Sequence, residues 1–564
     1  MSNIGALQTY LKTHQLAAFI VPHDDLFMGE YLAAHDERLA WATGFTGSAG
    51  LGIITQAKAL LQTDSRYTIQ AAQQCPHINV LETNAQPFAQ LLAWLQQALP
   101  QGGQISFDPW LFSQKRFEHW QMQLQNTSFK LTALSANPID ALWHNRPNAN
   151  PQKFWQHPIE VAGQSTPQKL ALLNITTPTM LTDVASVNWL LNIRGADIPY
   201  TPYAQSFALV MPQGDITLFI DLAKVPQDLP KNINCVALQN LTNFNYPTML
   251  QADPATAPYA LWQHWHNQKI MVQPVPDNCH GLRTLKNPTE LAGARQAHTH
   301  DAAAMANFLN WFSQQHGRTN LTEVEVVQAL QNCRVPQQGY MGDSFATIAG
   351  AGPNGAIVHY KPEPTTCRTL QPNELLLIDS GAQYNGLHST ASFCGTTDIT
   401  RVLWFGQGTP NAQSRHIYTT VLKSHIAAAS AVFPQHTTTG AQIDALARAP
   451  LWAQGLNFGH GLGHGVGSFA SVHDGAVKLS PQSQGVLAAT MLLTIEPGVY
   501  ITGQFGVRLE NVYEVVESGV ANMLAFKPLT LVPFDMALVD MAALTLAEQA
   551  WLVSYHALCG VKVC

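Results

Sequence analysis

The feature that most limits the possible folds is a set of potential metal ligands in strand or glycine-turn settings. Four strand-like segments of the C-terminal half carry one carboxylate each: Asp379 after the apolar run 375–378, Asp398 within 396–402, Glu496 after 491–495 and Glu510 within 507–512. Side chains alternate between the two faces of a strand, so Asp398 shares a face with Thr400, and Arg508 with Glu510. Glu496 and Glu510 are expected on two successive antiparallel strands, a hairpin that brings both carboxylates to one end of a sheet.

A glycine-rich segment supplies an imidazole. Residues 459–465 have the sequence GHGLGHG, which is too rich in glycine for a stable helix. Its two histidines, His460 and His464, are therefore not spaced to share a helix face. In a chain with 22 histidines, about one His-x-x-x-His pair is expected by chance, so this pair by itself indicates little.

Four carboxylates that converge with one imidazole need cations, because like charges repel and raise each other's pKa. Two divalent metal ions about 3.5–4 Å apart neutralise such a cluster and hold a shared water as hydroxide. An oxygen-rich set with one nitrogen ligand favours Mn²⁺ or Co²⁺ over a thiolate zinc site. Each carboxylate alone has a plainer interpretation as a turn former or helix cap. Arg508 and Glu510 could equally form a solvated pair on an edge strand, so the prediction depends on all segments occurring together.

Length and charge exclude several other classes of protein. A chain of 564 residues exceeds the roughly 250–300 residues of a single core, so two to four domains are expected. The net charge of −7 offers no basic surface for nucleic acid or anionic lipid. The cysteines form no C-x-x-C pair, the N-terminus has no signal-peptide pattern, and no apolar run approaches the roughly 20 residues of a membrane span. We therefore expect a cytoplasmic location and no membrane interaction.

The N-terminal half shows a weak internal repeat. Each of its two regions has an apolar strand, a turn and a second strand ending at an aspartate, Asp64 in the first and Asp221 in the second. Convergent βαβ patterns would look alike, so duplication is only one interpretation. A linker rich in Pro and Asn spans 143–151, and a long helix is predicted over Glu290–Ser313. The predicted domains are residues 1–150, 151–285 and 286–564.

Taken together, these segments resemble a known family. Five motifs look like the aminopeptidase P (Xaa-Pro aminopeptidase) branch of the pita-bread metallopeptidases: DSGAQY from Asp379, GTTDITR from Gly395, HGLGHGVGS from His460, IEPG from Ile495 and VRLEN from Val507. The resemblance is strongest to the cytosolic three-domain form and covers nearly the whole chain. It implies two creatinase/prolidase-like α/β N-terminal domains followed by a C-terminal pita-bread α+β catalytic domain.

The resemblance also implies a role for each site residue. The five expected metal ligands, with Asp398 and Glu510 bridging two ions, are Asp379, Asp398, His464, Glu496 and Glu510. The metal would be Mn²⁺, with Co²⁺ or Zn²⁺ as alternatives. Three histidines are expected around the substrate: His359, His460 and His473. Arg508 is expected to orient Asp398 or a neighbouring carboxylate through charge-assisted hydrogen bonds.

Three departures from the family pattern stand out. Asp379 and Asp398 are 19 positions apart, and residues 385–394 (NGLHSTASFC) look like an insertion in the intervening hairpin. These residues are expected to bulge outward. The segment 487–491 lacks a glycine that the family often has, which should alter a turn. Asp474 follows His473 where glutamate is more usual.

The implied activity is release of the N-terminal residue from peptides with proline in second position, by a hydroxide bridging two divalent cations. His359 or His473 would help to stabilise the oxyanion, and Glu496 or Glu510 would move a proton to the leaving nitrogen. The alternatives are a prolidase restricted to dipeptides, an inactive binding scaffold and a creatinase-like hydrolase without metal. The Pro-rich stretch 528–533 and the extra domain favour the aminopeptidase. A homodimer is expected from the resemblance.

Overall fold

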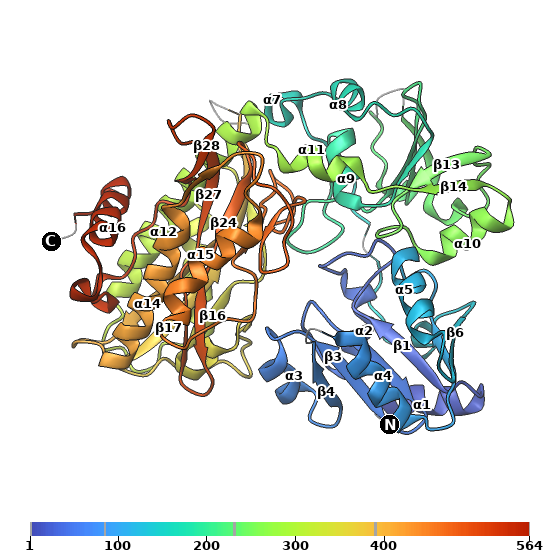
Figure 1. The fold of residues 1–564 in the computed structure, drawn as a ribbon, viewed down its shortest axis with the longest axis horizontal. Helices are drawn as coiled ribbons and strands as arrows, with labels where there is room; N and C mark the ends of the chain where they lie inside the picture. The colour runs from blue at the N-terminus through green and yellow to red at the C-terminus, as the bar shows by residue number, and fades with distance from the viewer. Residues whose placement is uncertain (1–2, 84–85, 150, 229–232, 388–391, 563–564) are drawn as a thin grey trace. The chain divides into compact units, whose positions relative to one another are not determined.

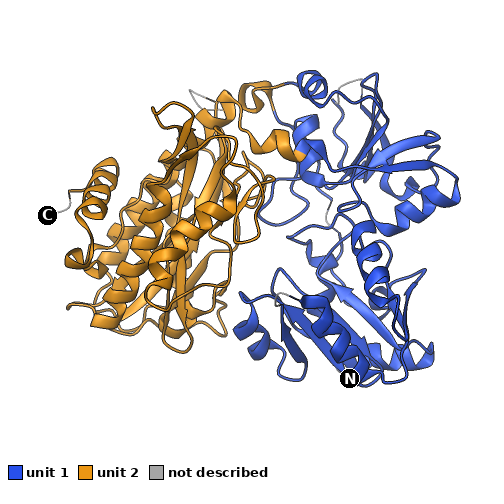
Figure 2. Ribbon diagram, in the orientation of Figure 1, with its two compact units in different colours: residues 1–157, 165–279 blue, residues 158–164, 280–564 orange. Residues whose placement is uncertain are grey.

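The computed structural model describes residues 3–83, 86–149, 151–228, 233–387 and 392–562. The chain divides into two compact units, which Figure 2 colours separately: residues 1–157 with 165–279, and residues 158–164 with 280–564. Within the described ranges, none of the helices combines the length and the apolar character needed to cross a membrane.

The first part of unit 1 is a six-stranded sheet in the order β4-β3-β2-β1-β5-β6. Its strands are β1 (Ala18–Pro22), β2 (Leu51–Thr55), β3 (Ala59–Thr63), β4 (Asn79–Glu82), β5 (Gly103–Phe107) and β6 (Phe129–Ala133). Its helices are α1 (Asn3–Thr13), α2 (Arg38–Thr43), α3 (Thr68–Gln74), α4 (Pro87–Ala98), α5 (Gln114–Leu124) and α6 (Pro138–Leu142). The three central strands are antiparallel, and the outer strands add in parallel.

The second part of unit 1 repeats this topology with the order β12-β11-β10-β8-β13-β14. Its strands are β8 (Thr179–Leu181), β10 (Phe207–Val210), β11 (Ile216–Ile220), β12 (Ile233–Ala237), β13 (Met249–Ala252) and β14 (Met271–Pro274). The remaining β-strands and α-helices described before residue 285 are β7 (Trp155–Gln156), α7 (Ile159–Ala162), α8 (Thr166–Leu173), α9 (Val184–Leu191), β9 (Ile193–Arg194), α10 (Tyr259–Asn267) and α11 (Asn278–Thr284).

The two sheets match strand for strand in order and direction. Asp64 and Asp221 follow the equivalent strands β3 and β11, as the sequence repeat predicts. This shared topology supports duplication over mere convergence, because a chance βαβ pattern would not reproduce all five strand pairings of the six-stranded sheet.

Unit 2 contains several small sheets and long helices. The helices are α12 (Pro288–Ser313), α13 (Glu323–Arg334), α14 (Ala412–Ala429), α15 (Gly440–Trp452) and α16 (Leu546–Leu558). The strands before residue 410 are β15 (Tyr340–Asp343), β16 (Ile348–Ala351), β17 (Glu374–Ser380), β18 (Ala382–Asn385), β19 (Cys394–Thr396) and β20 (Ile399–Phe405). Those after it are β21 (Val432–Pro434), β22 (Gly463–His464), β23 (Lys478–Leu479), β24 (Leu492–Ile495), β25 (Gly498–Ile501), β26 (Phe505–Arg508), β27 (Asn511–Glu517) and β28 (Met523–Pro528).

The long helix predicted over Glu290–Ser313 is confirmed as α12. It begins at Pro288, where a missing N–H costs nothing. The side chain of Asn287 accepts hydrogen bonds from the first turn, and the Glu290 carboxylate accepts one from the N–H of Asn287. This capping box satisfies backbone donors that the helix itself leaves unpaired.

Helices cover both faces of the sheet that contains β17. Leu375 and Leu377 pack in the same core cluster as α14 and α15, which lie side by side in Figure 1. Leu376 and Ile378 pack in the cluster of α12 and α13. Alternate side chains of a strand point to opposite faces, so a strand covered on both sides must be continuously apolar. This requirement explains the apolar run that leads to Asp379.

Two hairpins of unit 2 change sheets halfway along. In the first hairpin, β17 pairs with β20 and β18 pairs with β19, in different sheets. The predicted single strand over residues 396–402 is therefore wrong, since the chain leaves one sheet at Thr396 and enters the next at Ile399. The backbones on the two sides of this break lie so close that only glycine fits at position 381. A Cβ on Gly381 would lie 2.0 Å from the carbonyl oxygen of Thr397.

The second hairpin is divided in the same way. Strand β24 pairs with β27, while the intervening β25 and β26 pair with each other. The strands next to Glu496 and Glu510 are therefore antiparallel partners as predicted, but they are not successive. Ile495 pairs with Asn511, so the two glutamates lie at the same end of this pair.

The expected insertion, residues 385–394, connects β18 to β19. Its described flanks stay paired, because the N–H of Gly386 donates to the carbonyl of Phe393 over 2.8 Å. Phe393 is buried and stacks on His300 at a centroid distance of 5.0 Å. The expected outward bulge falls on residues 388–391, which lie outside the described residues.

Candidate metal centre

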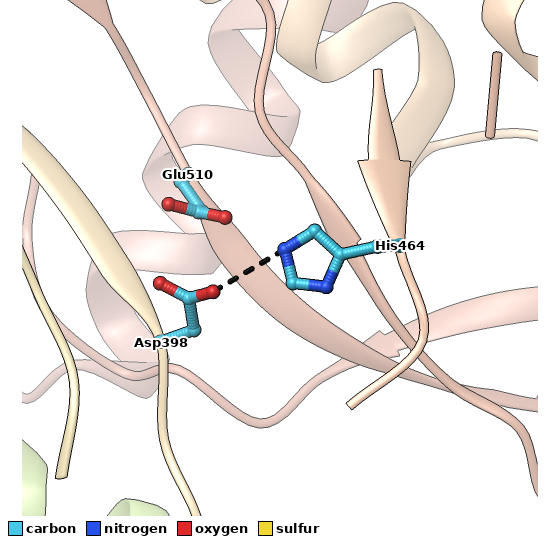
Figure 3. Close-up of side chains that lie close together, drawn as sticks. All are labelled: Asp398, His464 and Glu510. Atoms are coloured by element: carbon cyan, nitrogen blue, oxygen red, sulfur yellow. Dashed lines mark ion pairs between the residues drawn. The ribbon is translucent and has the colours of Figure 1, made fainter. Parts of the chain in front are cut away.

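Three predicted ligands meet at the breaks of the two hairpins. Asp398 lies between β19 and β20, Glu510 lies between β26 and β27, and His464 ends β22. Each offers one ligand atom, and the three atoms all lie within 4.8 Å of one another. Figure 3 shows the side chains pointing toward one another, with Nε2 of His464 3.4 Å from Oδ2 of Asp398. Asp398 and Glu510 each lie between two strands that belong to different sheets, so their side chains are not bound to the alternation of one continuous strand.

The other two predicted ligands adjoin this group. Glu496 follows β24 directly, and its Oε1 lies 3.7 Å from Nε2 of His464. Asp379 lies one residue before the end of β17. Its charge raises the pKa of both Asp398 and Glu510, which places it near them. Its Oδ1 is buried without a hydrogen-bond partner among the described residues. A buried carboxylate oxygen in this state suits coordination of a cation.

Burial and mutual repulsion make this cluster unfavourable without counter-charge. Asp398 and Glu510 are 4% and 1% exposed. Burial, followed by the charges of Asp379 and Glu496, raises the pKa of Asp398 well above its ordinary value. Burial, followed by Asp398 and Asp379, does the same to the pKa of Glu510. Four oxygen donors and one imidazole therefore fit divalent cations, which favour such donor sets and neutralise them.

Arg508 holds one side of the cluster. Its Nη2 donates to Oδ2 of Asp379 at 2.5 Å, and its Nε donates to the hydroxyl of Thr400 at 3.2 Å. The same hydroxyl donates to Oε2 of Glu510 at 2.7 Å. The carboxylate that Arg508 orients is thus Asp379, not Asp398. Arg508 and Glu510 are each 1% exposed, so the interpretation as a solvated pair on an edge strand is wrong.

The three predicted histidines occupy different places around the cluster. The ring of His473 lies edge-on to that of His464, with centroids 4.2 Å apart. Its neighbour Asp474 is buried and forms an ion pair with Arg283 over 2.9 Å. His359 is half-buried and follows Val358, whose carbonyl accepts a hydrogen bond from Nη2 of Arg508.

His460 reaches the cluster through a residue that sequence reasoning missed. The hydroxyl of Tyr500 lies 2.8 Å from Nε2 of His460 and accepts a hydrogen bond from Nη1 of Arg508 at 2.8 Å. Burial raises the pKa of Tyr500 to about 12, so the hydroxyl keeps its proton near neutral pH. The only signal in the sequence is the place of Tyr500 on a strand that begins two residues after Glu496.

This network assigns the tautomer of His460. The guanidinium of Arg508 can only donate, so the Tyr500 oxygen accepts from it, and we infer that the hydroxyl proton is directed to Nε2 of His460. Nε2 is then the unprotonated nitrogen, and Nδ1 carries the hydrogen that it donates to the carbonyl of Gly461 at 2.7 Å. This hydrogen-bond network fixes the orientation of the His460 ring.

Known aminopeptidases are similar to this chain over its full length. The chain is 33% identical to aminopeptidase P1 of Arabidopsis thaliana, in a match covering 99% of this chain and 95% of that protein. It is 32% identical to Xaa-Pro aminopeptidase 2 of Homo sapiens, covering 100% of this chain and 85% of that protein. The chain belongs to the Xaa-Pro aminopeptidase family. The predicted family membership is thereby confirmed.

A solved structure from the Xaa-Pro aminopeptidase family shares the fold. The X-prolyl aminopeptidase of Caenorhabditis elegans, described as a cytosolic enzyme with a di-nuclear active site, matches with a TM-score of 0.90 and 32% identity. The match covers 98% of this chain and 94% of that chain.

Domain profiles agree with this architecture. Residues 4–141 and 145–290 each match the creatinase/prolidase N-terminal domain. Residues 292–517 match metallopeptidase family M24, and residues 522–564 match the C-terminal region of peptidase M24. The predicted fold class, two creatinase/prolidase-like domains followed by a pita-bread catalytic domain, is confirmed.

Proposed function

We propose that this chain releases the N-terminal residue from peptides with proline in second position, using two divalent cations. The ligands would be Asp379, Asp398, His464, Glu496 and Glu510, with Asp398 and Glu510 bridging. The observation that carries the proposal is the buried meeting of Asp398, His464 and Glu510 within 4.8 Å, in a chain related to Xaa-Pro aminopeptidases along its whole length.

The metal ions and the protein would divide the chemistry. Two divalent cations would lower the pKa of water, so that hydroxide forms near neutral pH, and would polarise the scissile carbonyl. The oxygen-rich donor set favours Mn²⁺, with Co²⁺ or Zn²⁺ as alternatives. As in the hydrolysis of any amide, the leaving nitrogen, here that of proline, must take up a proton.

The exposure of the two glutamates supports one of the two candidates for that proton transfer. Oε2 of Glu510 accepts a hydrogen bond from Thr400, and its residue is 1% exposed. The side chain of Glu496 is 18% exposed, so it can reach both a bound peptide and solvent. We therefore assign the proton-carrying role to Glu496 and a purely structural ligand role to Glu510.

The surrounding residues would bind and orient the peptide. His359 and His473 would donate hydrogen bonds to the oxyanion that forms at the scissile carbonyl. His460 would present an imidazole ring whose orientation is fixed by the hydroxyl of Tyr500. Arg508 would hold Asp379 in place through a charge-assisted hydrogen bond to Oδ2 of its carboxylate.

A prolidase restricted to dipeptides is the nearest alternative. Both would use the same five ligands, so the site by itself does not separate them. Similarity to Xaa-Pro aminopeptidase 2 of Homo sapiens over 100% of this chain favours the aminopeptidase. Comparing the turnover of an Xaa-Pro-Xaa tripeptide with that of an Xaa-Pro dipeptide tests the choice; turnover of the dipeptide alone would establish the prolidase.

The deciding experiment combines metal with a ligand substitution. With added Mn²⁺, the purified chain should cleave an Xaa-Pro tripeptide, and Glu510→Ala should lower the rate by roughly three orders of magnitude or more. Glu517→Ala is the matched control, because Glu517 is exposed on the same strand β27. A near-normal rate for Glu510→Ala, or a chain without bound divalent cation and without metal-restored activity, would overturn the proposal.

Three further proposals concern the whole chain. We propose domain boundaries near residues 150 and 285, a cytoplasmic location and a homodimer. The cytosolic relative from Caenorhabditis elegans supports the location. The homodimer stays a prediction from the resemblance, and sedimentation velocity would test it.

A further inference from the structure

We propose that Glu323 is a positioning residue that fixes the segment carrying His359 beside the metal centre. The inference rests on the proposed role of His359 toward the substrate. Glu323 is the first residue of α13, far along the chain from every predicted ligand, and no motif in the sequence draws attention to it.

The carboxylate of Glu323 is completely buried, and both of its oxygens accept hydrogen bonds. The residue is 0% exposed. Oε1 accepts hydrogen bonds from the N–H of Ala351 at 2.8 Å and from Nδ2 of Asn354 at 3.0 Å. Oε2 accepts from the hydroxyl of Tyr360 and from the N–H of Arg368, each at 2.7 Å. The second oxygen also lies 3.1 Å from Nδ2 of Asn354.

These donors bracket one short segment. Ala351 ends β16, a 3-10 turn spans Gly352–Ala356, and Tyr360 follows His359 directly. Glu323 therefore holds the start, the middle and the end of a loop of about ten residues, together with the backbone of Arg368 beyond it. A single carboxylate suits this task because its two oxygens accept up to four hydrogen bonds.

The other side of the same loop is fixed to the metal centre. The backbone of Gly355 packs directly on β26, since a Cβ on Gly506 would lie 1.8 Å from the carbonyl oxygen of Gly355. The carbonyl of Val358 accepts a hydrogen bond from Nη2 of Arg508, the same nitrogen that contacts Asp379. His359 thus lies between Val358, which is bonded to Arg508, and Tyr360, which is bonded to Glu323.

Simple stabilisation of the helix is the competing explanation. A carboxylate in the first turn of a helix is favourable because of the helix dipole. However, α13 already has another carboxylate in its first turn, that of Glu325, which forms the capping box with Thr322. Removing Glu323 from solvent costs free energy that only its hydrogen bonds offset, and most of those bonds go to the loop rather than to the helix.

The test separates positioning from stability by coupling two substitutions. Glu323→Gln keeps the shape of the side chain, but its NH₂ group faces donors and breaks at least one bond to the loop. We expect kcat/KM to fall about 10–100-fold while the bound metal content stays unchanged. Combined with His359→Ala, the substitution should cause less than about a twofold further loss, because Glu323 acts through His359.

Two variants guard against misfolding as an explanation. Glu325→Gln, a matched change two residues away in the same helix, should lower stability but leave kcat/KM unchanged. Tyr360→Phe removes one of the bonds to Glu323 and leaves the carboxylate in place, so an intermediate loss is expected even if Glu323→Gln does not fold. Multiplicative losses in the Glu323→Gln, His359→Ala double variant would overturn the proposal.

Hydrogen exchange provides a readout that does not need activity. In Glu323→Gln, the amides of residues 352 and 354–360 should exchange faster, whereas those of β17 should not change. Unchanged exchange in the loop would refute the positioning role whatever the enzyme does. If the loop loosens but the wild-type chain hydrolyses no Xaa-Pro peptide with any divalent metal, the proposed function fails and the positioning role stands. If His359→Ala alone leaves kcat/KM unchanged, the inference fails and metal-dependent hydrolysis remains.

Discussion

The hydroxyl of Thr400 donates a hydrogen bond to Oε2 of Glu510 across 110 positions of sequence. The backbone of the same two residues is also paired, because the N–H of Glu510 donates to the carbonyl of Thr400 at 3.2 Å. The hydroxyl also accepts from Nε of Arg508. One threonine thus aligns both the backbone and the side chain of a proposed bridging ligand.

Replacing this hydroxyl should weaken metal binding. Thr400→Val keeps the shape of the side chain but leaves Nε of Arg508 without that acceptor. We expect kcat/KM and metal affinity to fall about 10-fold and the free energy of unfolding to fall by about 1–3 kcal/mol. Titration with Mn²⁺ and the tripeptide assay measure both effects. Thr438→Val is the control, since that buried hydroxyl bonds to Pro434 instead; an equal loss of metal affinity in the control would contradict the prediction.

Tyr500→Phe should act on His460 rather than on the metal ions. The substitution removes the hydroxyl that bonds to both Nε2 of His460 and Nη1 of Arg508. We expect bound metal to stay constant while kcat/KM falls about 10-fold or more. In NMR spectra of the wild type, the ring nitrogens of His460 should show a single tautomer with the hydrogen on Nδ1. In Tyr500→Phe, they should show a mixture of tautomers. A wild-type spectrum showing Nε2–H for this residue would refute the assignment directly.

Backbone strain lies in the segment 487–491, which lacks the glycine that the family often has there. Thr490 has a φ of 72°, a region that β-branched residues adopt only at a cost of about 1–2 kcal/mol. Thr490 therefore has a left-handed backbone conformation that glycine would adopt without this cost. Thr490→Gly should raise the unfolding temperature, with a gain of about 1 kcal/mol after the extra chain entropy of glycine.

Asn373→Gly provides the comparison for this gain. Asn373 has a similar φ of 65°, but asparagine tolerates the left-handed region better than threonine does. Its replacement should therefore stabilise the chain less. A loss of stability in Thr490→Gly would show that contacts of the threonine side chain outweigh the strain.

His425 should make the fold sensitive to acid. Burial, with a smaller effect from Arg401, lowers the pKa of His425 to about 3, and its ring lies between the carbonyl of Leu509 and the hydroxyl of Tyr513. The unfolded chain takes up a proton near the ordinary value of about 6.5, whereas the folded chain does not. Stability from this group is therefore complete above pH 6.5 and is lost as the pH falls toward 3, by about 1.4 kcal/mol per pH unit.

Comparison with His425→Gln isolates this contribution. The variant should be less stable at neutral pH. Between pH 6.5 and 4.5, however, its free energy of unfolding should fall less steeply than that of the wild type, and the difference in slope should correspond to the uptake of about one proton on unfolding. Urea titrations at saturating metal measure the two slopes. Parallel slopes would mean that another group carries the acid sensitivity.

The sequence alone determined the kinds of side chain in the centre and the local elements that carry them. Asp379 follows an apolar strand and α12 begins at Pro288 because periodicity, capping residues and turn residues act between near neighbours. The motifs from Asp379 to Glu510 also identified the family, which the full-length relatives bear out.

Only the tertiary structure decided which of these residues touch. It divided both hairpins at the carboxylates, joined Arg508 to Asp379, placed Tyr500 against His460 and turned Glu323 toward the loop of His359. These contacts join segments up to 129 positions apart. A local pattern records which face a residue occupies but not what lies opposite it, because that depends on how separate strands and helices pack around a shared core.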